Sequence, residues 1–106
     1  MIEIAGLLNN KYNGNYKFTK MVNHRPMYQS FNGVYAIWFD GLLSSPDWMI
    51  GLSTVLDARK FTIGYAQSNR DTRCPDFRDV STEWWENKWS SNTNIALTCI
   101  GKTLFK

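Results

Sequence analysis

The residue types that commonly carry catalysis are sparse in this chain of 106 residues. His24 is the single histidine, so any Ser-His-Asp or Cys-His arrangement would have to use it, and a histidine-rich metal site is excluded. It precedes Arg25 and Pro26 in a predicted turn, and a lone histidine without a positioned nucleophile is typical of a solvated loop residue. We therefore expect no catalytic residue and no metal ligand.

Carboxylates occur in two close pairs, Asp76 with Asp79 and Glu83 with Glu86. Two such acids hydrolyse glycosidic bonds when they lie about 5 to 10 Å apart across a cleft. A short chain with short loops offers little cleft, so solvated acids are the favoured interpretation. A small hydrolase using Asp76 or Glu83 is the weakest function hypothesis. The glycines match no phosphate-binding pattern, so we expect no nucleotide cofactor and no other cofactor.

The two cysteines, Cys74 and Cys99, have no spacing typical of a metal site. A bridge between them would close a loop that stabilises the fold by about 3 kcal/mol, in an oxidising compartment only. Cys99 lies in the apolar run 95–100, where a buried free thiol is the commoner explanation. The sequence leaves both states open.

Aromatic residues are the most prominent feature of the composition, with five Trp, five Tyr and six Phe. A buried ring removes roughly 150 to 250 Å² from water, so these rings can supply the core of a small domain. Rings beyond that need are candidate binding surface. On a single strand Trp84 would face away from Trp85 and Trp89, so we expect at least one of the three to be exposed.

The formal net charge of +3 is unevenly distributed, with basic ends and an acidic middle. If the terminal segments are neighbouring strands, their lysines form a weak basic face. Lys17 lies between Tyr16 and Phe18, a pattern that also occurs in single-strand nucleic-acid binders, where bases stack on rings. The alternation of these two rings favours a buried strand face instead.

Alternating apolar residues predict strands at 2–4, 16–18, 27–31, 34–39, 48–52, 61–65 and 95–100. Asn32-Gly33 predicts a hairpin with a type I′ turn between two of them. The polar stretch 67–79 is predicted to be a loop and is a candidate functional segment. Residues 81–89 fit either a helical turn or a strand.

These elements predict an all-β fold in a single domain spanning residues 1–106. The expected architecture is a small antiparallel meander of six or seven strands, curled into a barrel or sandwich, with one short helical turn near 81–89 as an option. The longest apolar run, residues 34–39, is far shorter than the roughly 20 residues of a membrane span, and the N-terminus does not match a secretory signal. We expect a soluble protein; the sequence indicates neither its compartment nor its oligomeric state.

Several short motifs follow one another between residues 12 and 85. They are Asn-Gly-x-Tyr at 13–16, Asn-x-Arg-Pro-x-Tyr at 23–28, Tyr-x-x-Trp at 35–38 and Trp-x-Ile-Gly at 48–51, with a later Pro75 and Trp84. This series resembles small repeated β modules found in proteins of protists and marine invertebrates. The resemblance implies a compact module that recurs in tandem or as an appended domain, and a binding or scaffolding role. It carries over no catalytic or binding residue.

The sequence as a whole favours a non-catalytic binding or assembly module whose ligand is either carbohydrate or another protein. Tryptophans are the candidate stacking residues and arginines their polar partners: Trp48, Trp84, Trp85, Trp89, Arg25, Arg70 and Arg73. The first alternative is a small barrel that binds single-stranded nucleic acid, whose affinity would fall steeply with salt. We predict that the protein is not an enzyme.

Overall fold

The computed structural model describes residues 1–40, 47–57, 65–68, 74–75, 81–86, 88–92 and 94–99. These residues are almost entirely antiparallel β, which confirms the predicted class. The elements are β1 (Ile2–Ala5), the 3-10 turn η1 (Asn10–Tyr12), β2 (Gly14–Val22), β3 (Arg25–Ser30), β4 (Tyr35–Asp40), β5 (Asp47–Leu52), α1 (Ser53–Asp57), β6 (Ala66–Ser68), β7 (Ser81–Trp85), β8 (Lys88–Ser91) and β9 (Ala96–Cys99).

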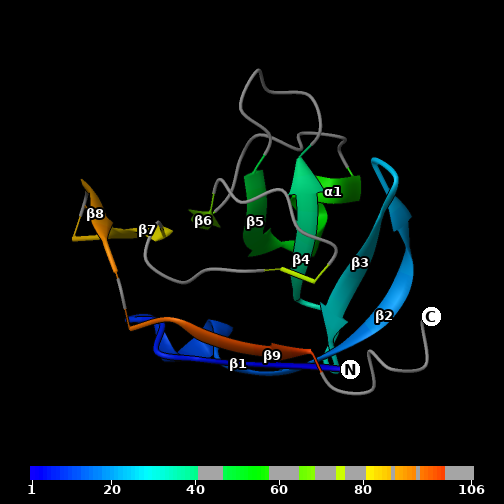
Figure 1. Ribbon diagram of the computed structural model, residues 1–106, viewed down its shortest axis with the longest axis horizontal. Helices are drawn as coiled ribbons and strands as arrows, with labels where there is room; N and C mark the ends of the chain where they lie inside the picture. The colour runs from blue at the N-terminus through cyan, green and yellow to red at the C-terminus, as the bar shows by residue number, and fades with distance from the viewer. Residues whose placement is uncertain are drawn as a thin grey trace.

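The nine strands of the described residues belong to one sheet, in the order β8-β7-β6-β5-β4-β3-β2-β1-β9 (Figure 1). Strands β1 to β8 form a meander, and β9 pairs with β1 at the opposite edge from β8. The terminal segments are therefore neighbouring strands at β1 and β9, which was the condition for a shared basic face. The lysines after residue 99 lie outside the described residues.

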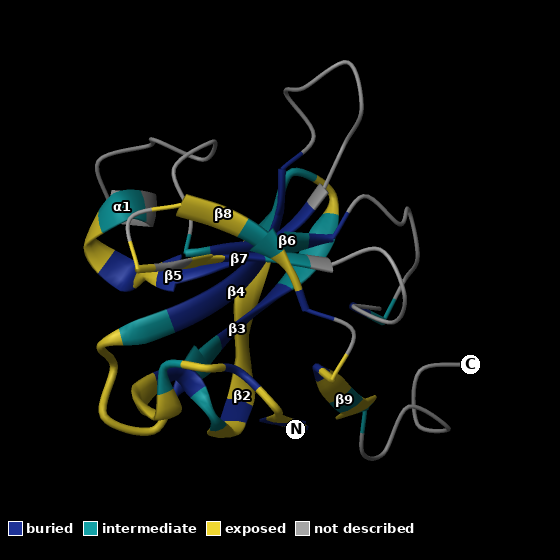
Figure 2. Ribbon diagram, turned by 90° about the vertical axis from the view of Figure 1, so that its left-hand side faces the viewer, coloured by how far each residue is buried: buried dark blue, intermediate teal, exposed yellow. Residues whose placement is uncertain are grey.

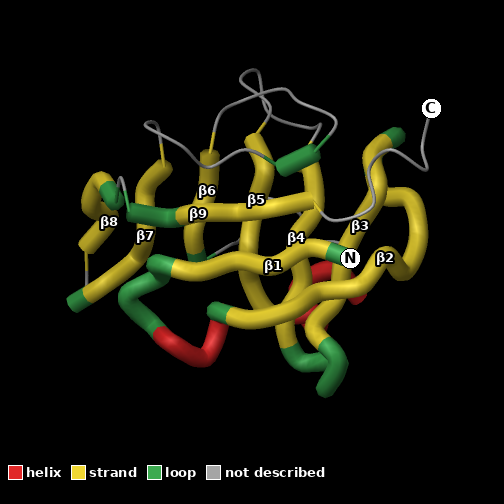
Figure 3. Tube along the Cα trace, turned by 60° about the horizontal axis from the view of Figure 1, so that its bottom comes forward, coloured by secondary structure: helices red, strands yellow, loops and turns green. Residues whose placement is uncertain are grey.

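The sheet curls into a half-barrel, so that β1 and β9 run across the inner face of the central strands (Figure 3). Ile2 and Ile4 of β1 pack there in one cluster with Ile37, Trp48 and Ile50. Each of these side chains is almost completely buried. Burying one large aliphatic side chain stabilises a fold by about 1.5 to 3 kcal/mol, so this inner cluster is the main core.

The outer face of the central strands carries a second, smaller core. Met27, Ala36, Trp38 and Met49 form this cluster, and Val55 of α1 packs against it. Strands β4 and β5 are therefore covered on both faces, and Figure 2 shows them buried along most of their length. A strand covered on both faces is continuously apolar, which matches the run in β4.

The predicted hairpin at Asn32-Gly33 is present between β3 and β4, but its turn is not type I′. Gly33 N donates to Ser30 O at 2.9 Å, which closes a turn whose central residues are Phe31 and Asn32, and neither of these has a positive φ. Gly33, which follows, has a φ of 78°. The Asn32 side-chain oxygen accepts from Val34 N at 3.0 Å. Residues 31–34 thus connect the two strands in place of a two-residue type I′ turn at Asn32-Gly33.

A two-residue turn with both φ values positive occurs instead at Asn23 and His24, at 52° and 67°. It joins β2 to β3, whose flanking residues Val22 and Arg25 pair directly. The φ values at both turn positions match a type I′ turn, whose twist suits a β-hairpin. His24 is exposed at this tip, as expected of a loop histidine.

The structure decides between the two alternatives for residues 81–89: their described part contains no helical turn and forms the hairpin β7–β8, with the chain reversing at Glu86, whose φ is 53°. The prediction of a polar loop from residue 67 was wrong at its start, because Gln67 and Ser68 belong to strand β6. The short α-helix of the described residues is α1, directly after β5. Of the predicted strand at 61–65, only Tyr65 is described.

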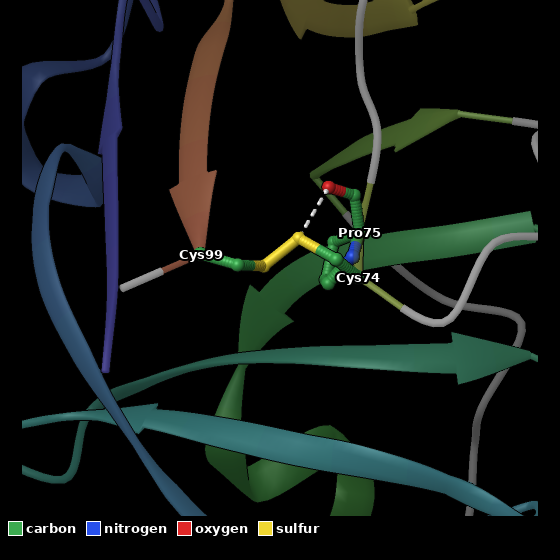
Figure 4. The surroundings of a disulfide bond; sticks show 3 residues. All are labelled: Cys74, Pro75 and Cys99. Carbon is green, nitrogen blue, oxygen red and sulfur yellow. Dashed lines mark hydrogen bonds between the residues drawn. A yellow bond between two sulfur atoms is a disulfide. The ribbon is translucent and has the colours of Figure 1, made fainter. Parts of the chain in front are cut away.

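Cys74 and Cys99 form a disulfide, with their Cα atoms 6.3 Å apart (Figure 4). Cys99 is the last residue of β9, and Cys74 precedes β7 in the chain. The bond therefore ties the edge strand beside β1 to the connection between β6 and β7. Of the two cysteine states that the sequence left open, the structure has the bridge.

Candidate functional site

Two exposed tryptophans form a pair on the β7–β8 hairpin. Trp84 and Trp89 lie directly opposite each other across the two strands, and 43% and 45% of their surfaces are exposed. Their ring centroids are 5.8 Å apart, with the planes inclined by 66°, an edge-to-face contact. Such a contact holds both rings in place while leaving part of each open to solvent.

The turn of the hairpin explains why these two rings share a face. Residues that pair directly across antiparallel strands point to the same side of the sheet. Because the chain reverses after Trp85, which pairs with Lys88, Trp84 and Trp89 come together on the outer side. The expectation that these two rings would face opposite ways assumed a single continuous strand and was wrong.

The strand positions around the Trp84–Trp89 pair are polar and uncharged. Thr82 pairs with Ser91 across the hairpin and with Gln67 on β6, so these three residues form the next row on the same outer face. Ser91 is exposed and Gln67 is half-buried, whereas the hydroxyl of Thr82 is buried and has no hydrogen-bond partner among the described residues. Accessible hydrogen-bonding groups thus lie beside the exposed rings.

A buried carboxylate anchors the hairpin to the rest of the sheet. Glu83 is completely buried, and its Oε2 accepts hydrogen bonds from Leu8 N at 2.8 Å, Asn9 N at 3.2 Å and the Tyr65 hydroxyl. Its Oε1 accepts from Asn92 Nδ2 at 2.6 Å. The four donors satisfy both oxygens, as a buried carboxylate requires. Glu83 therefore has a structural role, which contradicts its interpretation as a solvated acid.

Tyrosines surround this carboxylate on the inner side of the sheet. The Tyr65 ring stacks on Tyr12, with centroids 4.3 Å apart, and Tyr16 donates to Tyr12 O at 2.6 Å. Burial raises the pKa of Tyr65 above its ordinary value, and its hydrogen bond to Glu83 raises that pKa further. Burial also raises the pKa of Tyr16. These phenols therefore stay protonated well into the alkaline range.

The closure of the half-barrel depends on a close backbone approach at Gly6. Asn92 Nδ2 donates to Gly6 O at 3.1 Å, next to its bond with Glu83. Gly6 has a φ of 87°, and a Cβ at this position would lie 2.0 Å from Asn94 O. Only glycine fits here without displacement of the backbone. Gly6 and Asn92 thus join the loop after β1 to the hairpin that carries the Trp84–Trp89 pair.

The other predicted ligand residues lie elsewhere. Trp48 is completely buried and packs edge-on against Phe39 in the inner core. Its prediction as a ligand-stacking residue was therefore wrong, because its ring is not accessible to a ligand. Arg25 lies over the Phe39 ring at 4.9 Å, on β3, and three strands separate it from β7 in the sheet. Trp85 is in β7, but its side chain lies outside the described residues, as do Arg70 and Arg73.

A second group of exposed rings lies at the β2 and β3 side of the sheet. Phe31 is 62% exposed, and the Lys17 ammonium is 5.8 Å from its ring centroid, within the range of a cation–π contact. Phe18 is 49% exposed and packs edge-on against Tyr28. The alternation of Tyr16 and Phe18 predicted that both are buried; this is confirmed for Tyr16 and was wrong for Phe18.

Within the described ranges, no group of three or more metal-ligating side chains occurs. No helix in this part of the chain is long and apolar enough to cross a membrane. Asp76 and Asp79 lie outside the described residues. Comparison of the chain with protein-family models, curated proteins and solved structures finds no match.

Sequence reasoning missed the polar row and the role of Glu83. Gln67 was assigned to a loop, and its place beside Thr82 depends on the pairing of β6 with β7. A signal was available in the alternation of Thr82, Glu83 and Trp84, which fits a strand with one buried and one exposed face.

Proposed function

We propose that the protein is a non-catalytic binding module that binds carbohydrate at the Trp84–Trp89 pair. The observation that carries this proposal is a contrast in exposure. Trp38 and Trp48 are completely buried in the two cores, whereas Trp84 and Trp89 are each more than two-fifths exposed. Burying these two indoles is not needed to complete either core.

Indole rings suit sugars because a pyranose presents an apolar face of C–H groups between polar edges. Large exposed aromatic rings gain free energy when such an apolar face removes them from water. The hydroxyl of Ser91 and the amide of Gln67 supply hydrogen bonds of the kind that sugar hydroxyls make. The edge-to-face contact fixes both rings beforehand, which lowers the entropy lost on binding.

Another protein is the alternative ligand for the same pair, because exposed tryptophans are frequent energetic centres of protein interfaces. The two ligands differ in the size of the surface involved. A stable protein interface buries about 800 Å² per partner, so it would extend well past the hairpin. A sugar-binding site is confined to the rings and their immediate neighbours.

Screening of the protein on a glycan array tests the proposal. Wild-type protein should bind, and Trp84→Ala and Trp89→Ala should each lose at least tenfold in affinity. The matched control is Phe31→Ala, which removes a more exposed ring from a different part of the sheet and should bind like wild type. Melting temperatures of all variants should stay within a few degrees of each other.

Two outcomes would contradict the proposal. One is the absence of binding to any glycan by folded wild-type protein. The other is equal loss of affinity in the Phe31→Ala control, which would show that the Trp84–Trp89 pair is not the site. Loss of folding in Trp84→Ala and Trp89→Ala would assign the pair to stability, and Trp84→Phe would then separate stacking from folding.

Single-stranded nucleic acid is a second candidate, favoured by the contact of Lys17 with the exposed Phe31. A lysine can neutralise a phosphate while a ring stacks on a base, at about 1 to 3 kcal/mol per base. Affinity for a single-stranded oligonucleotide should then fall steeply as salt rises. Lys17→Gln and Phe31→Ala should weaken it, and Trp84→Ala should not. An affinity independent of salt would exclude this candidate.

A further inference from the structure

The inclination of the two indoles limits the shape of the ligand. Planes that meet at 66° cannot both lie flat against one planar surface. The ordered face of a crystalline polysaccharide is planar, so it could stack on one ring at most. A single chain in solution bends and twists, and it can follow both rings. The geometry therefore favours individual chains over crystalline surfaces.

The charge around the pair limits the chemistry of the ligand. The strand positions on this outer face of β6 to β8, namely Gln67, Thr82, Trp84, Trp89 and Ser91, are all uncharged. The exposed charged residues of the hairpin are Glu86 and Lys88, which are opposite in sign. A sulfated or carboxylated glycan would find no net positive charge on these residues. Neutral sugars match this surface.

The spacing along the strands gives the site a direction. Ser91 lies two residues along β8 from Trp89. Gln67 pairs with Thr82, which lies two residues along β7 from Trp84. At about 3.3 Å per residue, the polar row is therefore roughly 7 Å from the two tryptophans. One pyranose unit advances by somewhat less than this along a chain, so the neighbour of a unit stacked on one of the indoles would reach the polar row with its hydroxyl groups.

We infer that the outer face of the β7–β8 hairpin binds one soluble, neutral polysaccharide chain that runs along the strands. One sugar stacks on the face of one indole of the Trp84–Trp89 pair and contacts the edge of the other. The next sugar accepts or donates hydrogen bonds at Ser91 and Gln67. The inference rests on the proposed carbohydrate-binding function and specifies its ligand class. Thr82 takes no part in ligand contact because its hydroxyl is buried.

Calorimetric titration with cellohexaose, laminarihexaose and mannohexaose tests the inference. At least one of these neutral oligosaccharides should bind, and Ser91→Ala and Gln67→Ala should each weaken it about fivefold, the effect of losing one hydrogen bond. The matched control is Thr82→Val, which changes the same row at a buried hydroxyl and should leave affinity unchanged. Binding should be nearly independent of salt concentration.

Heparin and crystalline cellulose are the competing probes. Salt-sensitive binding to heparin that exceeds binding to the neutral oligosaccharides would overturn the inference, and so would retention on crystalline cellulose without binding to any soluble chain. Either result would leave the proposed carbohydrate-binding function intact. Absence of binding to every glycan would instead refute the proposed function itself, so the two failures are distinguishable.

Discussion

Replacement of Glu83 by Gln is the sharpest test of how the half-barrel is closed. The carboxylate accepts three hydrogen bonds at Oε2 and one from Asn92 at Oε1. A glutamine can keep one oxygen toward the three donors, but it must then direct its NH₂ group at the Asn92 amide. Two donors would face each other in a completely buried site. Rotation of the Asn92 amide would break its bond to Gly6 instead.

The magnitude follows from the bonds that are lost. Removing one charge-assisted hydrogen bond and leaving buried donors unsatisfied should lower the free energy of unfolding by about 3 kcal/mol. For a chain of this length the melting temperature should fall by roughly 12 to 24 °C. Thermal and urea unfolding followed by circular dichroism would measure both quantities.

The matched control for this substitution is Glu86→Gln. Glu86 lies three residues away in the same hairpin and is exposed, so the same chemical change should alter stability by less than about 0.5 kcal/mol. Equal stability of Glu83→Gln and wild type would refute the reasoning, because it would mean that the buried hydrogen bonds do not hold the hairpin against the loop after β1.

Three further predictions concern stability. Replacing Cys74 and Cys99 together by serine should lower the free energy of unfolding by about 3 kcal/mol in urea titrations, since the bridge spans 25 residues of sequence; an unchanged midpoint would contradict it. Gly6→Ala should lower the melting temperature more than Gly14→Ala does, because only the substitution at Gly6 places a Cβ against backbone atoms. Equal decreases in melting temperature would contradict the close approach of Gly6 to the Asn94 backbone. The raised pKa values of Tyr16 and Tyr65 should stabilise the fold fully below a pH of about 10, their unfolded value, and that stabilisation should be lost as pH rises through the folded pKa values. A phenolate absorbance titration of the folded protein should show ionisation at higher pH than the same titration in concentrated urea, and coincident titration curves would contradict the burial of these phenols.

Local patterns predicted the parts of the fold that depend on neighbouring residues. The hairpin at Asn32-Gly33 and the strand from Trp48 to Leu52 were both recognisable from turn chemistry and alternation. The turn type was not, because the Asn32 side chain supplies a hydrogen bond that a dipeptide pattern does not specify. The type I′ geometry at Asn23-His24 carries no glycine to mark it.

The candidate site could be predicted only in part. The presence of three tryptophans between residues 84 and 89 predicted that at least one of them is exposed. The pairing of Trp84 with Trp89, in contrast, depends on the reversal of the chain at Glu86. Trp48 shared an alternating pattern with Ile50, and the sequence could not reveal that both faces of its strand are covered. The donors to Glu83 include Leu8, 75 residues away in the chain, a contact that local periodicity does not encode.

The central claim, that the Trp84–Trp89 pair is the ligand site, is tested most directly by nuclear magnetic resonance of the indole N–H groups during titration with a soluble neutral oligosaccharide. The account predicts that the signals of Trp84 and Trp89 shift progressively and saturate, while those of the buried Trp38 and Trp48 stay in place. Saturable shifts confined to residues around Lys17 and Phe31, with Trp84 and Trp89 unmoved, would contradict it.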